Sequence, residues 1–214
     1  PLVENNYRGA LAHQFIPMDP VLWKIENYRD FLDARRSLIA MKINEFMNSL
    51  IKDPVTLHKR PIIELIKLGE SETLEFKSTF QWDVVQNQQN KELRKSALKT
   101  LVAFLNSQGG TLVIGVEDDG KILGLEKDLT LVSDHSKDRF ANLLSSLIIE
   151  KIGAEFSPYI KLRFEALNGA EVCVLDVNQA SSPSFFAGDK GSEFFIRVGP
   201  TSRLLDPEET VSYI

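Results

Sequence analysis

The first 60 residues have a helical pattern of apolar positions. Asp19 followed by Pro20 is a typical helix start, with an N-cap and a proline at the first helical position. From residue 21 to residue 50, large apolar residues recur at helical spacing, and Asp53-Pro54 ends the run. This part predicts a helix over 21–50 and a connector over 51–61.

Beyond residue 60 the spacing of apolar positions changes repeatedly between every second residue, typical of strands, and about every fourth residue, typical of helices. Residues 73–77 alternate polar and apolar side chains and predict a strand. Residues 91–108 carry an apolar stripe and predict a helix, ended by Gly109 and Gly110. Residues 112–116 are wholly apolar and predict a buried strand, while the Gln- and Asn-rich stretch 80–90 predicts a loop.

Two hairpin signals and two more helices complete the pattern. Asp119-Gly120 predicts a turn with 122–125 returning, and Asn168-Gly169 predicts a hairpin between 161–166 and 172–177. A helix over 138–152, a strand over 194–198 and a helix starting at 206–209 are also expected. This order predicts the α+β class, with a mixed, mostly antiparallel sheet and helices packed on it, plus a short helical N-terminal segment.

Composition places the chain among proteins with a packed core, since 43% of its 214 residues are hydrophobic. Cys173 is the single cysteine, so an intramolecular disulfide is excluded and a reducing, cytoplasmic setting is expected. No apolar run approaches the roughly 20 residues of a membrane span, so no membrane partner is expected. Because the chain begins with Pro1, we expect covalently linked upstream domains. Residues 1–60 would be their helical tail and connector, and 61–214 one α+β domain.

The chain has a net charge of −5, which is distributed unevenly along its length. Residues 1–60 hold 9 Lys and Arg against 7 Asp and Glu, whereas residues 61–214 hold 16 against 23. An acidic domain binds nucleic acid poorly without specific contacts, because neutralising phosphates drives such binding. A role with nucleic acid would therefore require a local basic patch or metal ions.

Three sequence blocks resemble the Schlafen AlbA domain over residues of about 69–213. They are ESETLEFK at 70–77, AFLN at 103–106 with GGTLVIGVEDDG at 109–120, and FIRVG at 195–199 with TSR at 201–203. The resemblance implies a nucleic-acid-binding domain of the kind found in bacterial regulators and RecG-like proteins, which also forms the nuclease core of animal Schlafens. The expected function is a DNA- or RNA-binding module of a bacterial defence or regulatory protein, including phage defence and transcriptional regulation.

Residues of about 10–52 carry a second resemblance. The segments HQFIP at 13–17, LW at 22–23 and FLDARR at 31–36 are similar to the C-terminal end of GmrSD-like restriction proteins, which combine a ParB-like part with an HNH nuclease part. The HNH motif itself is not in this sequence.

Three acidic residues fall on the metal site of nuclease-active Schlafens: Glu70, Glu75 and Asp118. The resemblance implies a metal-dependent endonuclease on RNA or single-stranded DNA, because clustered carboxylates bind Mg²⁺ or Mn²⁺. The alternative is that Glu70 and Asp118 are ordinary turn acids and that Glu75 pairs with Lys77 or Arg197. Animal Schlafens also hold zinc, but the histidines here are scattered, so no zinc is expected.

Basic residues form a candidate phosphate-binding set. Lys91, Lys95 and Lys99 recur every four residues on one helix face beside Arg94. The remaining candidates are Lys77, Arg197 and Arg203, the last two flanking a turn with Thr201 and Ser202. The alternatives are a merely solvated helix face, and an Arg197 that balances a carboxylate.

A third function remains open, a protein-interaction or homodimerisation domain. The acidic balance favours it, and Phe185 and Phe186, beside Pro183, are expected to be an exposed interface loop. Gly109 and Gly110 are better explained by a helix end than by a nucleotide-binding loop, because no Lys-Ser/Thr pair follows them.

Overall fold

The computed structural model describes residues 61–189 and 191–214. The helix predicted over 21–50 and the GmrSD-like segment lie outside these residues, and the division at residue 60 stays a prediction.

The main sheet has four strands in the order β1-β4-β6-β5. Their bounds are Leu74–Lys77 for β1, Gly110–Ile114 for β4, Ile160–Leu167 for β5 and Ala170–Val177 for β6. β1 and β4 are parallel because helix α4 (Glu92–Asn106) connects them, whereas the other pairs are antiparallel. The mixed, mostly antiparallel sheet of an α+β domain is confirmed.

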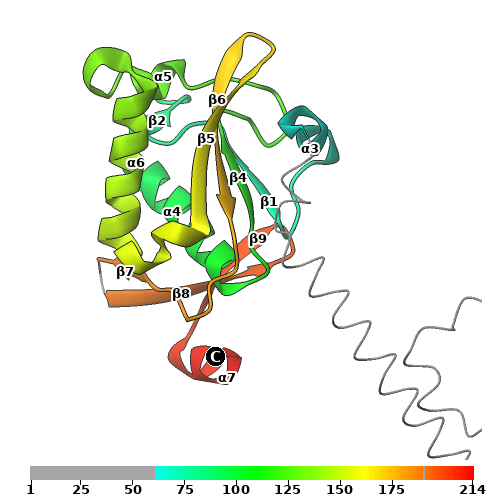
Figure 1. Ribbon diagram of the computed structural model, residues 1–214, viewed down its shortest axis with the longest axis vertical. Coiled ribbons are helices and arrows are strands. Elements are labelled where there is room, and N and C mark those ends of the chain that lie inside the picture. Colours follow the sequence, from blue (N-terminus) through cyan, green and yellow to red (C-terminus); the bar gives the residue numbers. More distant parts are fainter. Residues whose placement is uncertain (1–60, 190) are drawn as a thin grey trace, which may run out of the picture. The chain divides into compact units, whose positions relative to one another are not determined.

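Helices cover both faces of this sheet (Figure 1). On one face α4 and α6 (Lys137–Lys151) bury the larger core, which includes Leu101 and Phe140 with Leu112 and Leu175 of the strands. On the other face α3 (Ile62–Leu68) packs on the strands through Ile62. A strand covered on both faces reads as an unbroken apolar run, which is the pattern of β4.

A second, three-stranded antiparallel sheet packs against α4 (Figure 1). It contains β7 (Phe186–Gly188), β8 (Gly191–Val198) and β9 (Thr201–Leu205), and α7 (Pro207–Tyr213) follows it. The side chain of Asn106, the last residue of α4, donates to the backbone oxygens of Ser184 and Phe195 at 2.8 and 2.9 Å. This one amide therefore fastens the end of α4 to the second sheet.

The hairpin turn predicted at Asn168-Gly169 and the helix end predicted at Gly109 are both confirmed. Asn168 and Gly169 have φ values of 50° and 86°, as a two-residue hairpin loop between β5 and β6 requires. Gly109 has φ of 79°, and its N–H donates to the Phe104 oxygen at 3.0 Å, which ends α4. A Cβ on Gly110 would lie 2.5 Å from the Phe104 ring, so β4 starts in direct contact with the helix.

Several elements differ from the prediction. α3 was not predicted, and the predicted loop 80–90 contains the short hairpin of β2 (Trp82–Asp83) and β3 (Gln88–Gln89). The strand predicted over 122–125 is reduced to one bridge between Val116 and Ile122. β7 and β9 were not predicted.

Short helical turns occupy the connections. They are α5 (Glu126–Leu129) and 3₁₀ helices at Ser133–His135 and Ala154–Tyr159. Across the described part of the chain, every helix is too short or too polar to cross a bilayer.

Candidate functional site

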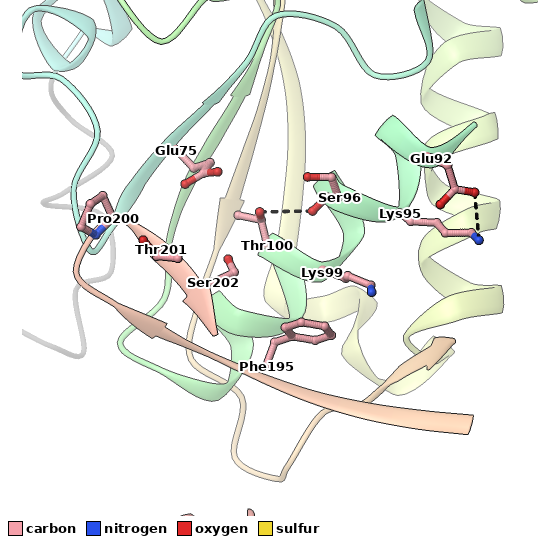
Figure 2. A pocket seen from close by; sticks show the side chains of 10 residues that line it. All are labelled: Glu75, Glu92, Lys95, Ser96, Lys99, Thr100, Phe195, Pro200, Thr201 and Ser202. Carbon is pink, nitrogen blue, oxygen red and sulfur yellow. Dashed lines mark hydrogen bonds and ion pairs between the residues drawn. The ribbon is translucent and has the colours of Figure 1, made fainter. Parts of the chain in front are cut away.

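A pocket of about 410 Å³ lies between α4, β1 and the β8–β9 turn. Ten residues line it: Glu75, Glu92, Lys95, Ser96, Lys99, Thr100, Phe195, Pro200, Thr201 and Ser202. Figure 2 shows Glu75, Thr100 and Ser202 around a common space, each carried by a different element. The pocket thus joins residues of the first and third sequence blocks to the start of α4.

The helical side of the pocket follows from the spacing of α4. Glu92, Ser96 and Thr100 recur every four residues and therefore share one face, beside the row of Lys95 and Lys99. The Thr100 hydroxyl donates to the Ser96 backbone oxygen at 3.3 Å (Figure 2). The face combines hydroxyl, carboxylate and ammonium groups.

Both lysines of the pocket are paired with acids. Lys95 Nζ lies 2.6 Å from Asp189 and 3.0 Å from Glu92, and the bond to Asp189 is the main cause that raises the pKa of Lys95. Lys99 Nζ lies 2.7 Å from Glu193. The Lys95–Asp189 pair is solvent-screened, because Asp189 is 76% exposed, whereas Glu193 is only 26% exposed and holds Lys99 in a more sheltered pair.

Lys99 also lies over aromatic rings. Its Nζ is 5.3 Å from the Phe186 centroid and 5.0 Å from the Phe195 centroid. A cation within about 6 Å of a ring face is attracted by it. These contacts fix the direction in which Lys99 points.

Arg197, predicted as a phosphate contact, is buried and already paired, and its role with phosphate stays a prediction. Its side chain is 0% exposed and its Nη1 lies 2.9 Å from Glu75. The remaining donors reach the backbone oxygens of Ser71 and Glu72 at 2.8 and 3.2 Å and the Ser202 hydroxyl at 3.1 Å. Arg197 therefore ties β8 to the segment that leads into β1.

Glu75 is held between two cations. One carboxylate oxygen accepts from Arg197, and the other lies 2.5 Å from Lys77 Nζ. The interpretation that Glu75 pairs with Lys77 or Arg197 is confirmed, and both bases take part. Lys77 is engaged as well, with 23% of its side chain exposed.

The other two predicted metal ligands, Glu70 and Asp118, lie before β1 and after β4. Glu70 Oε1 accepts the Phe76 N–H at 2.8 Å, so Glu70 does reach β1 from the loop before it. Burial raises the pKa of Glu70, and the charges of Glu75 and Asp118 add to the increase. Asp118 is exposed in the turn after β4.

These carboxylates do not fit a resident Mg²⁺ or Mn²⁺. Within residues 61–189 and 191–214, no group of three acidic, histidine or cysteine side chains is arranged to hold a metal ion. The positive charge that a metal would supply to Glu75 is already supplied by Arg197 and Lys77. A ligand set of this kind needs free oxygens converging on one point.

The remaining candidate bases lie outside the pocket lining. Lys91 is exposed and forms no ion pair with any residue that the structure describes. Arg94 is partly buried, which lowers its pKa, and it donates to the Gln81 side chain. Arg203 pairs with Glu209 at the start of α7.

The sequence interpretation missed part of the pocket. Glu92, Ser96 and Thr100 had a usable signal, their four-residue spacing beside the predicted lysine row. Asp189 and Glu193, which pair with the lysines, lie about 90 residues away in sequence and gave none.

The predicted interface loop is only half exposed. Phe186 is 1% exposed and lies under Lys99, so its predicted exposure is wrong. Phe185 is 38% exposed, and its ring centroid lies 5.2 Å from that of Phe194.

The fold and pocket define an α+β domain in which a helix and a second sheet enclose a polar pocket beside a mixed sheet. The family model described as "Schlafen, AlbA_2" matches residues 70–206, which is more than half of the chain. The chain belongs to this family, as the three sequence blocks predicted. The match leaves the GmrSD-like resemblance of residues 10–52 a prediction.

Solved structures give more distant similarities. The DIP2311 protein from Corynebacterium diphtheriae is similar with 21% identity and a TM-score of 0.47, over 66% of this chain and 23% of that one. The N-terminal domain of a protein from Nitrosomonas europaea, named as ATP-dependent DNA helicase RecG-related, is similar with 20% identity and a TM-score of 0.36, over 63% of this chain and 84% of that one. A comparison with curated proteins finds no match.

Proposed function

We propose that this domain binds DNA or RNA and that the pocket between α4 and the β8–β9 turn holds phosphate groups of the strand. The observation that carries the proposal is the pocket itself, which Lys95 and Lys99 of α4 line together with Thr201 and Ser202 of β9. Membership of the Schlafen AlbA_2 family supports it.

The chemistry of the pocket suits a phosphodiester. Two ammonium groups supply charge, and Ser96, Thr201 and Ser202 supply hydroxyl donors. Lys91, exposed one helical turn before Lys95, extends the row toward the start of α4. A strand following this row would meet three lysines at regular spacing.

Local binding also agrees with the acidic composition. Residues 61–214 hold 16 Lys and Arg against 23 Asp and Glu, so the domain as a whole repels phosphates. Binding would then depend on displacing Asp189 and Glu193 from the two lysines. The proposal extends to a module of a cytoplasmic bacterial defence or regulatory protein with linked upstream domains.

A binding assay on the full chain tests the proposal. Labelled single-stranded RNA, single-stranded DNA and duplex DNA are titrated with wild type, with Lys95→Ala/Lys99→Ala, and with the control Lys67→Ala/Lys161→Ala. The control removes the same charge from exposed lysines outside the pocket. We expect at least one of these strands to bind wild type.

The pocket variant is expected to bind that strand about tenfold or more weakly, which corresponds to about 1.4 kcal/mol or more from two lost phosphate contacts. The control should bind like wild type. Equal losses in both variants, or no binding by wild type, would contradict the proposal. With Mn²⁺ present the strands should stay intact, because the three carboxylates do not fit a metal site.

A further inference from the structure

The β2–β3 hairpin presents an apolar tip to solvent. Val85 is 90% exposed and Val84 is 47% exposed. The turn around them is ordered, because Asp83 Oδ1 accepts the N–H groups of Val85 and Gln86 at 3.0 and 2.9 Å. Two β-branched side chains are therefore held outside the core in a defined position.

The rest of the hairpin is lined with amides. Four consecutive side chains carry them, and all four are exposed: Gln86, Asn87, Gln88 and Gln89. An amide offers both a donor and an acceptor and so matches the edge of a nucleobase, and the exposed bond in which Gln88 Nε2 donates to Gln86 Oε1 at 2.5 Å can be exchanged for one to a base. Residues 84–90 contain no charged side chain that would favour the phosphates instead.

A buried network anchors the base of the hairpin. Asp128 is 0% exposed, and its oxygens accept the N–H groups of Phe80 and Gln81, each at 2.8 Å. The Gln81 oxygen accepts the Asn90 N–H at 2.8 Å, and Arg94 donates to the Gln81 side chain. Both ends of the hairpin are thus fixed to the domain, which lowers the cost of ordering the tip in a complex.

The hairpin runs directly into the proposed phosphate pocket. Asn90 Oδ1 accepts the N–H of Glu92, the first residue of α4 and a pocket residue, at 3.0 Å. Lys91, between them, is exposed. An extended strand lying in the pocket therefore reaches the hairpin when it passes the start of α4.

We infer that residues 84–89 contact the bases of a single-stranded nucleic acid whose phosphates lie along Lys95 and Lys99. This inference rests on the proposed function. Single strands expose base faces and edges that a duplex hides, so Val84 and Val85 can pack on base faces while the amides bond to base edges. The site thereby selects single strands over duplexes.

Two hairpin variants test the inference, Val84→Ser/Val85→Ser and Gln86→Ala/Gln88→Ala. The matched control is Ile149→Ser/Val211→Ser, which changes two apolar residues of similar exposure on α6 and α7, 52% and 80% exposed. Each protein is titrated with 12-nucleotide oligouridine and oligoadenine and with a 12-base-pair duplex. Because all these side chains lie at the surface, thermal melting should match wild type.

We expect wild type to prefer the single strands and each hairpin variant to lose roughly three- to fivefold of that affinity, the size expected from one buried apolar contact or one hydrogen bond. Duplex affinity and the salt dependence should not change, because the lysines remain. The inference is overturned if the hairpin variants bind single strands like wild type, or if the control loses as much. If Lys95→Ala/Lys99→Ala still weakens binding in that case, the proposed function stands alone, whereas no binding by wild type overturns both.

Discussion

At the scale of single residues, Arg197 and Glu75 show how far a motif can be interpreted without a structure. The blocks that contain them were recognised correctly, and the pairing of Glu75 with Lys77 or Arg197 was among the alternatives. The choice depended on burial, which sequence does not give for a charged residue. Because Arg197 is 0% exposed, it needs an acid beside it, and Glu75 has the role of that counter-charge.

Removing the charge of Glu75 should therefore destabilise the fold. Glu75→Gln leaves Arg197 buried without its counter-ion, and we expect the free energy of unfolding to fall by about 3 kcal/mol. Urea unfolding followed by circular dichroism measures it. Glu72→Gln is the control, because that exposed residue contacts Arg197 only through its backbone oxygen. An unchanged midpoint in Glu75→Gln would show that the buried pair contributes no stability.

At the scale of elements, long periodic segments were predictable and short ones were not. The apolar patterns of α4 and β4 predict these elements, and Asn168-Gly169 predicts the β5–β6 hairpin. α3 has only seven residues and depends on packing against the sheet, while β9 is mostly polar and exposed. Elements of this kind are stabilised by contacts distant in sequence rather than by their own pattern.

The β7–β8 hairpin adds a prediction at this scale, because it brings acids onto the lysines of α4. Asp189, which is 76% exposed, forms an ion pair with Lys95, the residue to which we propose that a phosphate binds. Asp189→Asn should raise the affinity for single-stranded oligonucleotides about two- to fivefold, since it removes a weak competitor.

Asp138→Asn, at an exposed position of α6, changes the net charge equally and serves as the control. Filter-binding titrations of both variants measure the difference. An increase of the same size in both variants would assign the effect to overall charge. No increase in Asp189→Asn would contradict the proposal that Asp189 competes with a phosphate for Lys95.

At the scale of the whole molecule, an acidic domain can bind nucleic acid only through a local site. The net charge of −5 gives no general attraction for phosphates, so binding depends on a few lysines at one pocket. The lysine row was visible in the sequence as a four-residue repeat. The opposite wall, formed by Thr201 and Ser202, became part of the same site only through the packing of the second sheet on α4.

The most direct test is the salt dependence of oligonucleotide binding, measured as log K against log salt for wild type and for Lys95→Ala/Lys99→Ala. For single strands each neutralised phosphate contributes a slope of about −0.7. We expect the slope to be shallower by about 1.4 in the variant than in wild type, because two phosphate contacts are lost. Parallel lines for the two proteins would contradict it.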